Sequence, residues 1–60
     1  MTSDASHPLR VLLAESNALD RAILARALRQ QNHSTYITEA TSLMAAYAAL
    51  STHCFDVVLI

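Results

Sequence analysis

The chain has 60 residues, of which 53% are hydrophobic and 15% are charged, and its net charge at pH 7 is −1. This composition excludes a disordered, highly charged polypeptide. Four arginines without any lysine exclude a basic surface dense enough for this segment to bind nucleic acid directly. The longest apolar run, residues 43–50, is far shorter than the roughly 20 residues of a membrane-spanning helix, so no membrane association is expected.

The single cysteine excludes an internal disulfide, and the first residues lack the apolar stretch of a secretion signal. Together these features predict a cytoplasmic protein. Residues 1–8 are polar and end in a proline, which predicts a flexible lead-in to a folded segment over residues 9–60.

Residues 10–14 (RVLLA) contain a continuous apolar run, which predicts a strand buried on both faces of a parallel sheet. A helix is predicted from Ala18 to about Gln31. Asn17 is its expected N-cap, and Asp20 is expected to return the hydrogen bond as in a capping box. One half of this helix is apolar and the other half carries Arg21, Arg26 and Arg29, while the following Asn32 tolerates the left-handed conformation common after a helix.

Residues 34–38 (STYIT) have the mixed polarity of a strand at the edge of a sheet. Thr41 or Ser42 is expected to cap a second helix. A third, continuously apolar strand is predicted at residues 57–60. The second helix has an apolar stripe at helical spacing that is predicted to be core: Leu43, Ala46, Tyr47 and Leu50.

Strands that alternate with helices predict an α/β fold with a parallel sheet and right-handed crossovers. The expected architecture is a flavodoxin-like sheet with strand order 2-1-3-4-5, truncated here to β-α-β-α-β. Two helices cannot cover both faces of three strands, so the chain is expected to be the first half of a domain of roughly 120 residues. We therefore expect these 60 residues to fold poorly on their own, with the third strand as an open apolar edge.

Polar residues follow the first strand at the edge of the sheet where ligands bind. In an open parallel sheet that place is the carboxyl end of the strands, where the winding direction reverses between the first and third strands. Glu15 and Ser16 follow the first strand, Asp20 lies in the first turn of the helix, and the residue after Ile60 would end the third strand. A binding site is predicted at these positions.

The stretches "VLLAESNALDRAILARALRQQNH", "TEATSLMAAYAAL" and "FDVVLI" together resemble the first half of a response-regulator receiver domain of the CheY-like family. The resemblance implies that the domain accepts a phosphoryl group from a histidine kinase or phosphotransfer protein on an Asp directly after Ile60. It also implies Mg²⁺ at the strand tips, held by an acidic pair and that Asp, and an output domain or protein partner.

In this resemblance Glu15 matches the first acid of the pair and is the best candidate metal-associated residue. Ser16 matches the second acid, and a neutral hydroxyl is a weak ligand for a hard cation, so Mg²⁺ binding is expected to be weakened or lost. Two simpler interpretations remain open. Glu15 can be a solvated residue at a strand end, and Ser16 can be a turn residue or an alternative N-cap.

Two other functions remain possible besides the phosphoryl-accepting receiver, which is not itself expected to be an enzyme. The first is a degenerate receiver that serves as a protein-interaction module independent of phosphorylation, as Ser16 indicates. The second is a segment of a nucleotide- or flavin-binding α/β enzyme. Such enzymes use glycines in the first loop to approach a phosphate, and this chain contains no glycine.

The histidines and the cysteine do not form a recognisable site. His7, His33 and His53 are far apart in the sequence and no paired cysteines accompany them, so zinc binding is not expected. Cys54 follows His53, but neighbours on an extended segment point in different directions. Cys54 is therefore predicted to be a buried, inert thiol.

Overall fold

The computed structural model describes residues 8–31 and 34–60. The predicted lead-in falls almost entirely outside these residues, as do Asn32, His7 and His33. The elements follow the predicted order: β1 (Leu9–Ala14), α1 (Ala18–Gln31), β2 (Thr35–Ala40), α2 (Leu43–Thr52) and β3 (Val57–Leu59). β2 runs two residues further than predicted.

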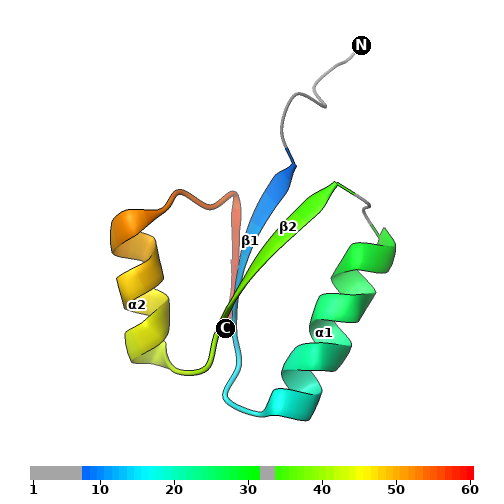
Figure 1. The fold of residues 1–60 in the computed structure, drawn as a ribbon, viewed down its shortest axis with the longest axis horizontal. Helices are drawn as coiled ribbons and strands as arrows, with labels where there is room; N and C mark the ends of the chain where they lie inside the picture. Colours follow the sequence, from blue (N-terminus) through cyan, green and yellow to red (C-terminus); the bar gives the residue numbers. More distant parts are fainter. Residues whose placement is uncertain (1–7, 32–33) are drawn as a thin grey trace.

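The three strands form one parallel sheet in the order β2-β1-β3, so β1 is the central strand. The two helices lie on opposite sides of this sheet (Figure 1). This arrangement follows from the rule that parallel crossovers are right-handed, because β2 and β3 lie on opposite edges of β1. The predicted flavodoxin-like fold, truncated to β-α-β-α-β, is confirmed.

The core is built around β1, where Val11, Leu12 and Leu13 are each at most 1% exposed. Side chains alternate across a strand, so Leu12 and Ala14 face one side of the sheet while Val11 and Leu13 face the other. On the α2 side, Leu12 and Ala14 pack with residues of β2, α2 and the loop before β3: Ala40, Ala45, Ala46, Ala49 and Phe55. Alanines at these positions let the backbone of α2 come close to the sheet.

The prediction that the apolar stripe of α2 is core is wrong for its large residues. Ala46 is buried, but Tyr47 is 67% exposed, and Leu43 and Leu50 are also exposed. The physical reason is the rotation of the helix, which turns the alanines toward the sheet and leaves the larger side chains on a neighbouring face. α1 behaves similarly: Ala25 is buried, whereas three large apolar residues are exposed, namely Leu19, Ile23 and Leu24.

The start of β3 is fastened to the start of β1. The Asp56 backbone N–H donates to the Arg10 carbonyl oxygen at 2.8 Å. The Arg10 backbone N–H donates to Asp56 Oδ2, also at 2.8 Å, and Arg10 Nε lies 3.6 Å from the same oxygen. These contacts set the register of the two strands from one end, and so determine which residues meet at the other end.

Neither α1 nor α2 has the length and apolar character of a membrane-crossing helix, and the described residues form no other helix.

A polypeptide of residues 1–60 alone is expected to show no cooperative thermal unfolding transition. The reasons are the small core and the open edge of β3, where Val57 and Val58 favour association with other chains. Circular dichroism during heating, with analytical ultracentrifugation of the same sample, would test this. A Val58→Lys variant is expected to associate less without gaining a cooperative transition, because a charge blocks edge pairing. A single sharp transition in a monomeric sample would contradict the prediction.

Candidate functional site at the strand ends

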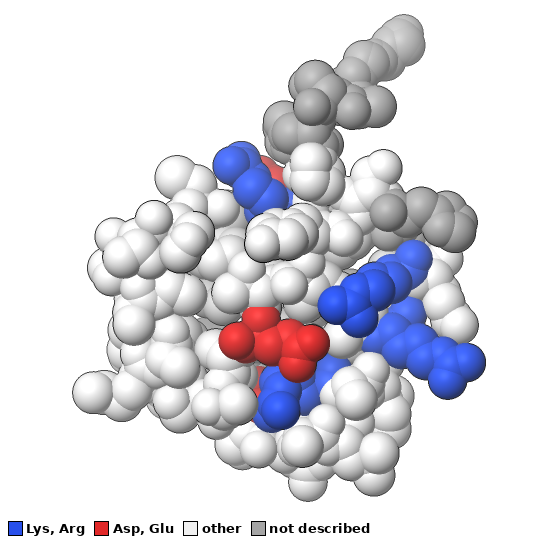
Figure 2. All heavy atoms as spheres, in the orientation of Figure 1, with Lys and Arg blue, Asp and Glu red and all other residues white. Residues whose placement is uncertain are grey.

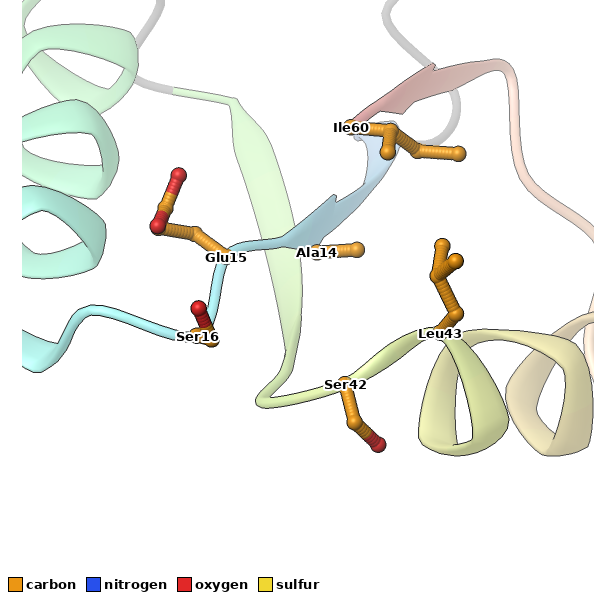
Figure 3. A pocket seen from close by; sticks show the side chains of 6 residues that line it. All are labelled: Ala14, Glu15, Ser16, Ser42, Leu43 and Ile60. Atoms are coloured by element: carbon orange, nitrogen blue, oxygen red, sulfur yellow. The ribbon is translucent and has the colours of Figure 1, made fainter.

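A hollow of about 230 Å³ lies at the carboxyl ends of β1 and β3, beside the start of α2 (Figure 3). In the parallel register of these strands, Leu13 pairs with Leu59. One further step along both strands places Ile60 beside Ala14, and both residues line the hollow. The hollow is lined by Ala14, Glu15, Ser16, Ser42, Leu43 and Ile60. The structure therefore brings Glu15 and Ser16 together with the tip of β3, at the predicted place.

Glu15 is held by hydrogen bonds at three points. Its backbone N–H donates to the Ala40 carbonyl oxygen at 2.9 Å, and its own carbonyl oxygen accepts from Arg21 Nη1 at 2.8 Å. Its side-chain Oε2 accepts from the Asn17 backbone N–H at 3.0 Å. In Figure 3 the carboxylate points to the α1 side and away from Ile60. Glu15 is thus a well-fixed residue of the strand tip, and one of its carboxylate oxygens is engaged by the turn.

The turn between β1 and α1 differs from prediction in one hydrogen bond. Asn17 is the N-cap as predicted, because its Oδ1 accepts from the Asp20 backbone N–H at 2.9 Å. The predicted return bond from the Asp20 carboxylate is wrong, since Glu15 Oε2 takes the Asn17 N–H instead. In a capping box the partner is usually a Glu or Gln three residues after the N-cap, whereas here a Glu two residues before Asn17 accepts from its N–H.

The two serines of the hollow differ in what they do. Ser42 is the N-cap of α2, as one of the two predicted alternatives, and its Oγ accepts from the Ala45 backbone N–H at 3.1 Å. The Ser42 hydroxyl points away from the hollow (Figure 3). Ser16 is exposed and lies between Glu15 and Asn17, two residues with fixed backbones. Ser16 is therefore the polar residue of the turn that is open to a ligand.

Arg21 and Glu39 are a pair that the sequence analysis did not single out. Arg21 Nε lies 3.0 Å from Glu39 Oε1, and the Arg21 side chain is only 16% exposed. Figure 2 shows acidic and arginine side chains in contact on this face, whereas the α2 side, whose helix contains no charged residue, is white. Arg21 shared the polar half of the predicted helix with two other arginines, so periodicity alone could not distinguish it. What distinguishes Arg21 in the sequence is its place in the first turn of the helix, where the helix dipole disfavours a cation.

The hollow offers few ligands for a metal ion. Glu15 supplies one carboxylate with one oxygen already hydrogen-bonded, and Ser16 supplies a neutral hydroxyl. Across residues 8–31 and 34–60, no group of three or more His, Cys, Asp or Glu side chains could hold a metal. Mg²⁺ prefers several oxygen ligands, including carboxylates. The two residues fit such an ion only as part of a larger set of ligands.

The prediction of a buried Cys54 thiol is wrong, because Cys54 is exposed. It lies in the loop between α2 and β3, where the next residue, Phe55, takes the inward position against the core. The preceding residue, His53, has its Nδ1 2.8 Å from Thr52 Oγ1, and its ring centroid is 6.3 Å from that of Phe55. His53 thus contacts Thr52 at the end of α2 and Phe55 in the loop.

Comparison of the chain with models of known protein families, with curated proteins and with solved structures finds no match in any of the three. The residues at the strand ends and their geometry are therefore what indicate a function for this chain.

Replacing Asn17 with Ala in the full-length protein is expected to lower the free energy of unfolding by about 1 kcal/mol, because the Asp20 N–H loses its acceptor. Urea unfolding would measure the change. Asn17→Asp keeps a side-chain acceptor at the N-cap and is the matched control, expected to unfold close to the unmodified protein. Equal destabilisation by both substitutions would contradict the capping role.

Proposed function

We propose that residues 9–60 form the first half of a receiver domain that accepts a phosphoryl group from a histidine kinase or phosphotransfer protein. The acceptor is an Asp directly after Ile60, and Mg²⁺ binds beside it. The observation that carries the proposal is the parallel register of β1 and β3, with Leu13 opposite Leu59. If both strands continue in this register for two more residues, the position after Ile60 would lie beside Glu15. An acceptor there would share the hollow with the Glu15–Ser16 turn.

Phosphoryl transfer depends mainly on positioning and on neutralising the charge of the transferred group. Bound Mg²⁺ supplies that neutralisation. Glu15 contributes a negative charge near the acceptor position and holds the turn through the Asn17 N–H. Ser16 contributes an exposed hydroxyl where the family usually has a second carboxylate. A site with one acid fewer binds the cation more weakly, which slows phosphorylation.

A second function is favoured by the same turn. Ser16 is neutral and one Glu15 oxygen already serves the turn, so the fold can persist without the metal. In that case the domain is a degenerate receiver that binds a protein partner independently of phosphorylation. Either form would work in the cytoplasm together with an output domain or a protein partner.

The turn argues against a nucleotide- or flavin-binding enzyme. Such enzymes bind a phosphate with the free backbone N–H groups at the start of the first helix. Here the Asn17 N–H donates to Glu15 Oε2 and the Asp20 N–H donates to Asn17 Oδ1. Side chains of the protein already occupy these donors, so these two N–H groups are not free to bind a phosphate.

In the full-length protein, Mg²⁺ with beryllofluoride is expected to shift the NMR amide signals of Glu15 and Ser16. Ser16→Asp is expected to tighten Mg²⁺ binding about tenfold or more, because it adds a carboxylate at the hollow. Glu15→Gln is expected to weaken it. The matched control is Asp20→Asn, which removes an exposed acid outside the lining of the hollow and should change the affinity little.

Three results separate the functions. A phosphoryl adduct on the residue after Ile60, found by mass spectrometry after treatment with a small phosphodonor, supports the phosphoryl-accepting receiver. Mg²⁺ binding only in the Ser16→Asp variant supports the degenerate receiver. Silence of the Glu15 amide signal in both the unmodified protein and the variant contradicts the phosphoryl-accepting receiver.

A further inference from the structure

We infer that Arg21 is the positioning residue of the strand-end site: its guanidinium holds the Glu15–Ser16 turn against β2 and so sets where that turn faces the hollow. What the turn binds rests on the proposed function, whereas the positioning itself rests on contacts within the chain. The inference depends on the bonds that one side chain makes to two different elements.

The Arg21 side chain joins α1 to both β1 and β2. Nη1 donates to the Glu15 carbonyl oxygen at 2.8 Å, just beyond the end of β1. Nε donates to Glu39 Oε1 at 3.0 Å, near the end of β2. The planar guanidinium makes both bonds at once, whereas a lysine ammonium lacks this fixed two-donor geometry. Arg21 therefore acts as a bracket between the ends of two strands.

Without its hydrogen-bonding partners, an arginine at position 21 would lower the stability of the fold. It lies in the first turn of α1, where the helix dipole disfavours a cation. Its side chain is largely withdrawn from water, with 16% exposed against 40% for Glu39. A carboxylate and a carbonyl oxygen at hydrogen-bonding distance compensate for both effects. These partners explain why an arginine is held at this place rather than extended into solvent.

Arg21 completes the fixation of the turn. The Glu15 N–H is bound to the Ala40 carbonyl oxygen, and Arg21 binds the Glu15 carbonyl oxygen on the other side of the same residue. The Glu15 carboxylate in turn holds the Asn17 N–H. Ser16 lies between these points, so the position of its backbone depends on the Arg21 bond. Loss of that bond frees the Ser16 side of the hollow while β1 and β2 remain paired.

Hydrogen exchange in the full-length protein tests the positioning directly. Arg21→Lys keeps the charge and is expected to speed exchange of the Asn17 amide about tenfold, because a charge-assisted hydrogen bond to the turn is lost or weakened. The Ala45 amide, bound to Ser42 at the start of α2, is the internal reference and should not change. Arg26→Gln, an exposed arginine of the same helix, is the control variant. Unchanged exchange at Asn17 in Arg21→Lys would overturn the inference.

A charge exchange between the partners separates positioning from simple stabilisation. The double variant Arg21→Glu with Glu39→Arg restores an ion pair between the two positions. The glutamate side chain at position 21, however, has no N–H group to donate to the Glu15 carbonyl oxygen. We expect the urea unfolding midpoint to recover toward that of the unmodified protein while Asn17 exchange stays fast. Recovery of both measurements would show that Arg21 acts only through its ion pair, and would overturn the inference.

Mg²⁺ titration of the same variants connects the inference to the proposed function. In the Ser16→Asp background, Arg21→Lys is expected to weaken Mg²⁺ binding about tenfold. Replacing a residue that holds a metal ligand in place typically lowers metal affinity by at least this much. If no Mg²⁺ binds even with intact Arg21, the proposed function fails and the exchange data alone decide the positioning role. If Mg²⁺ binds equally well with Arg and Lys at position 21, the positioning role fails and the proposed function stands.

Discussion

β1 is hydrogen-bonded along both edges and covered by a helix on each face, and the rest of the structure depends on this placement. The part of such a strand that both helices cover must be apolar, as Val11, Leu12 and Leu13 are. The same placement explains the site. A central strand has two neighbours, so its end meets β2 on one side and β3 on the other, and a polar residue after it is held between them.

The two sides of the β1 tip have different chemistry. Toward β2, Arg21 forms an ion pair with Glu39 and also donates to the Glu15 carbonyl oxygen. Toward β3, the hollow has an apolar wall made by Leu43 and Ile60. The charged side fixes the backbone of the turn, and the apolar side leaves space. This division lets the turn be rigid at Glu15 and still expose Ser16 to a ligand.

Large apolar residues remain exposed on both helices and on all three strands. Leu19 of α1, Tyr47 of α2 and Val58 of β3 each present much of their surface to solvent. Alanines take the positions closest to the sheet, so the helices pack tightly through little surface. In the proposed receiver, further elements would cover these residues, and the same elements would supply the remaining groups of the site.

Local sequence signals alone determined the order and nature of the elements, the N-cap Asn17 and the position of Glu15 at a strand end, and they narrowed the second N-cap to Thr41 or Ser42. Apolar runs, helical spacing and residues such as Asn17 and Ser42 act over a few positions, and short-range physics is readable from the chain. Only the tertiary structure decided which helix faces meet the sheet, that Cys54 is exposed, and that Arg21 reaches Glu39, eighteen positions away along the chain. Those outcomes depend on helix rotation and on contacts between distant residues, and the spacing of residues in the sequence does not specify either.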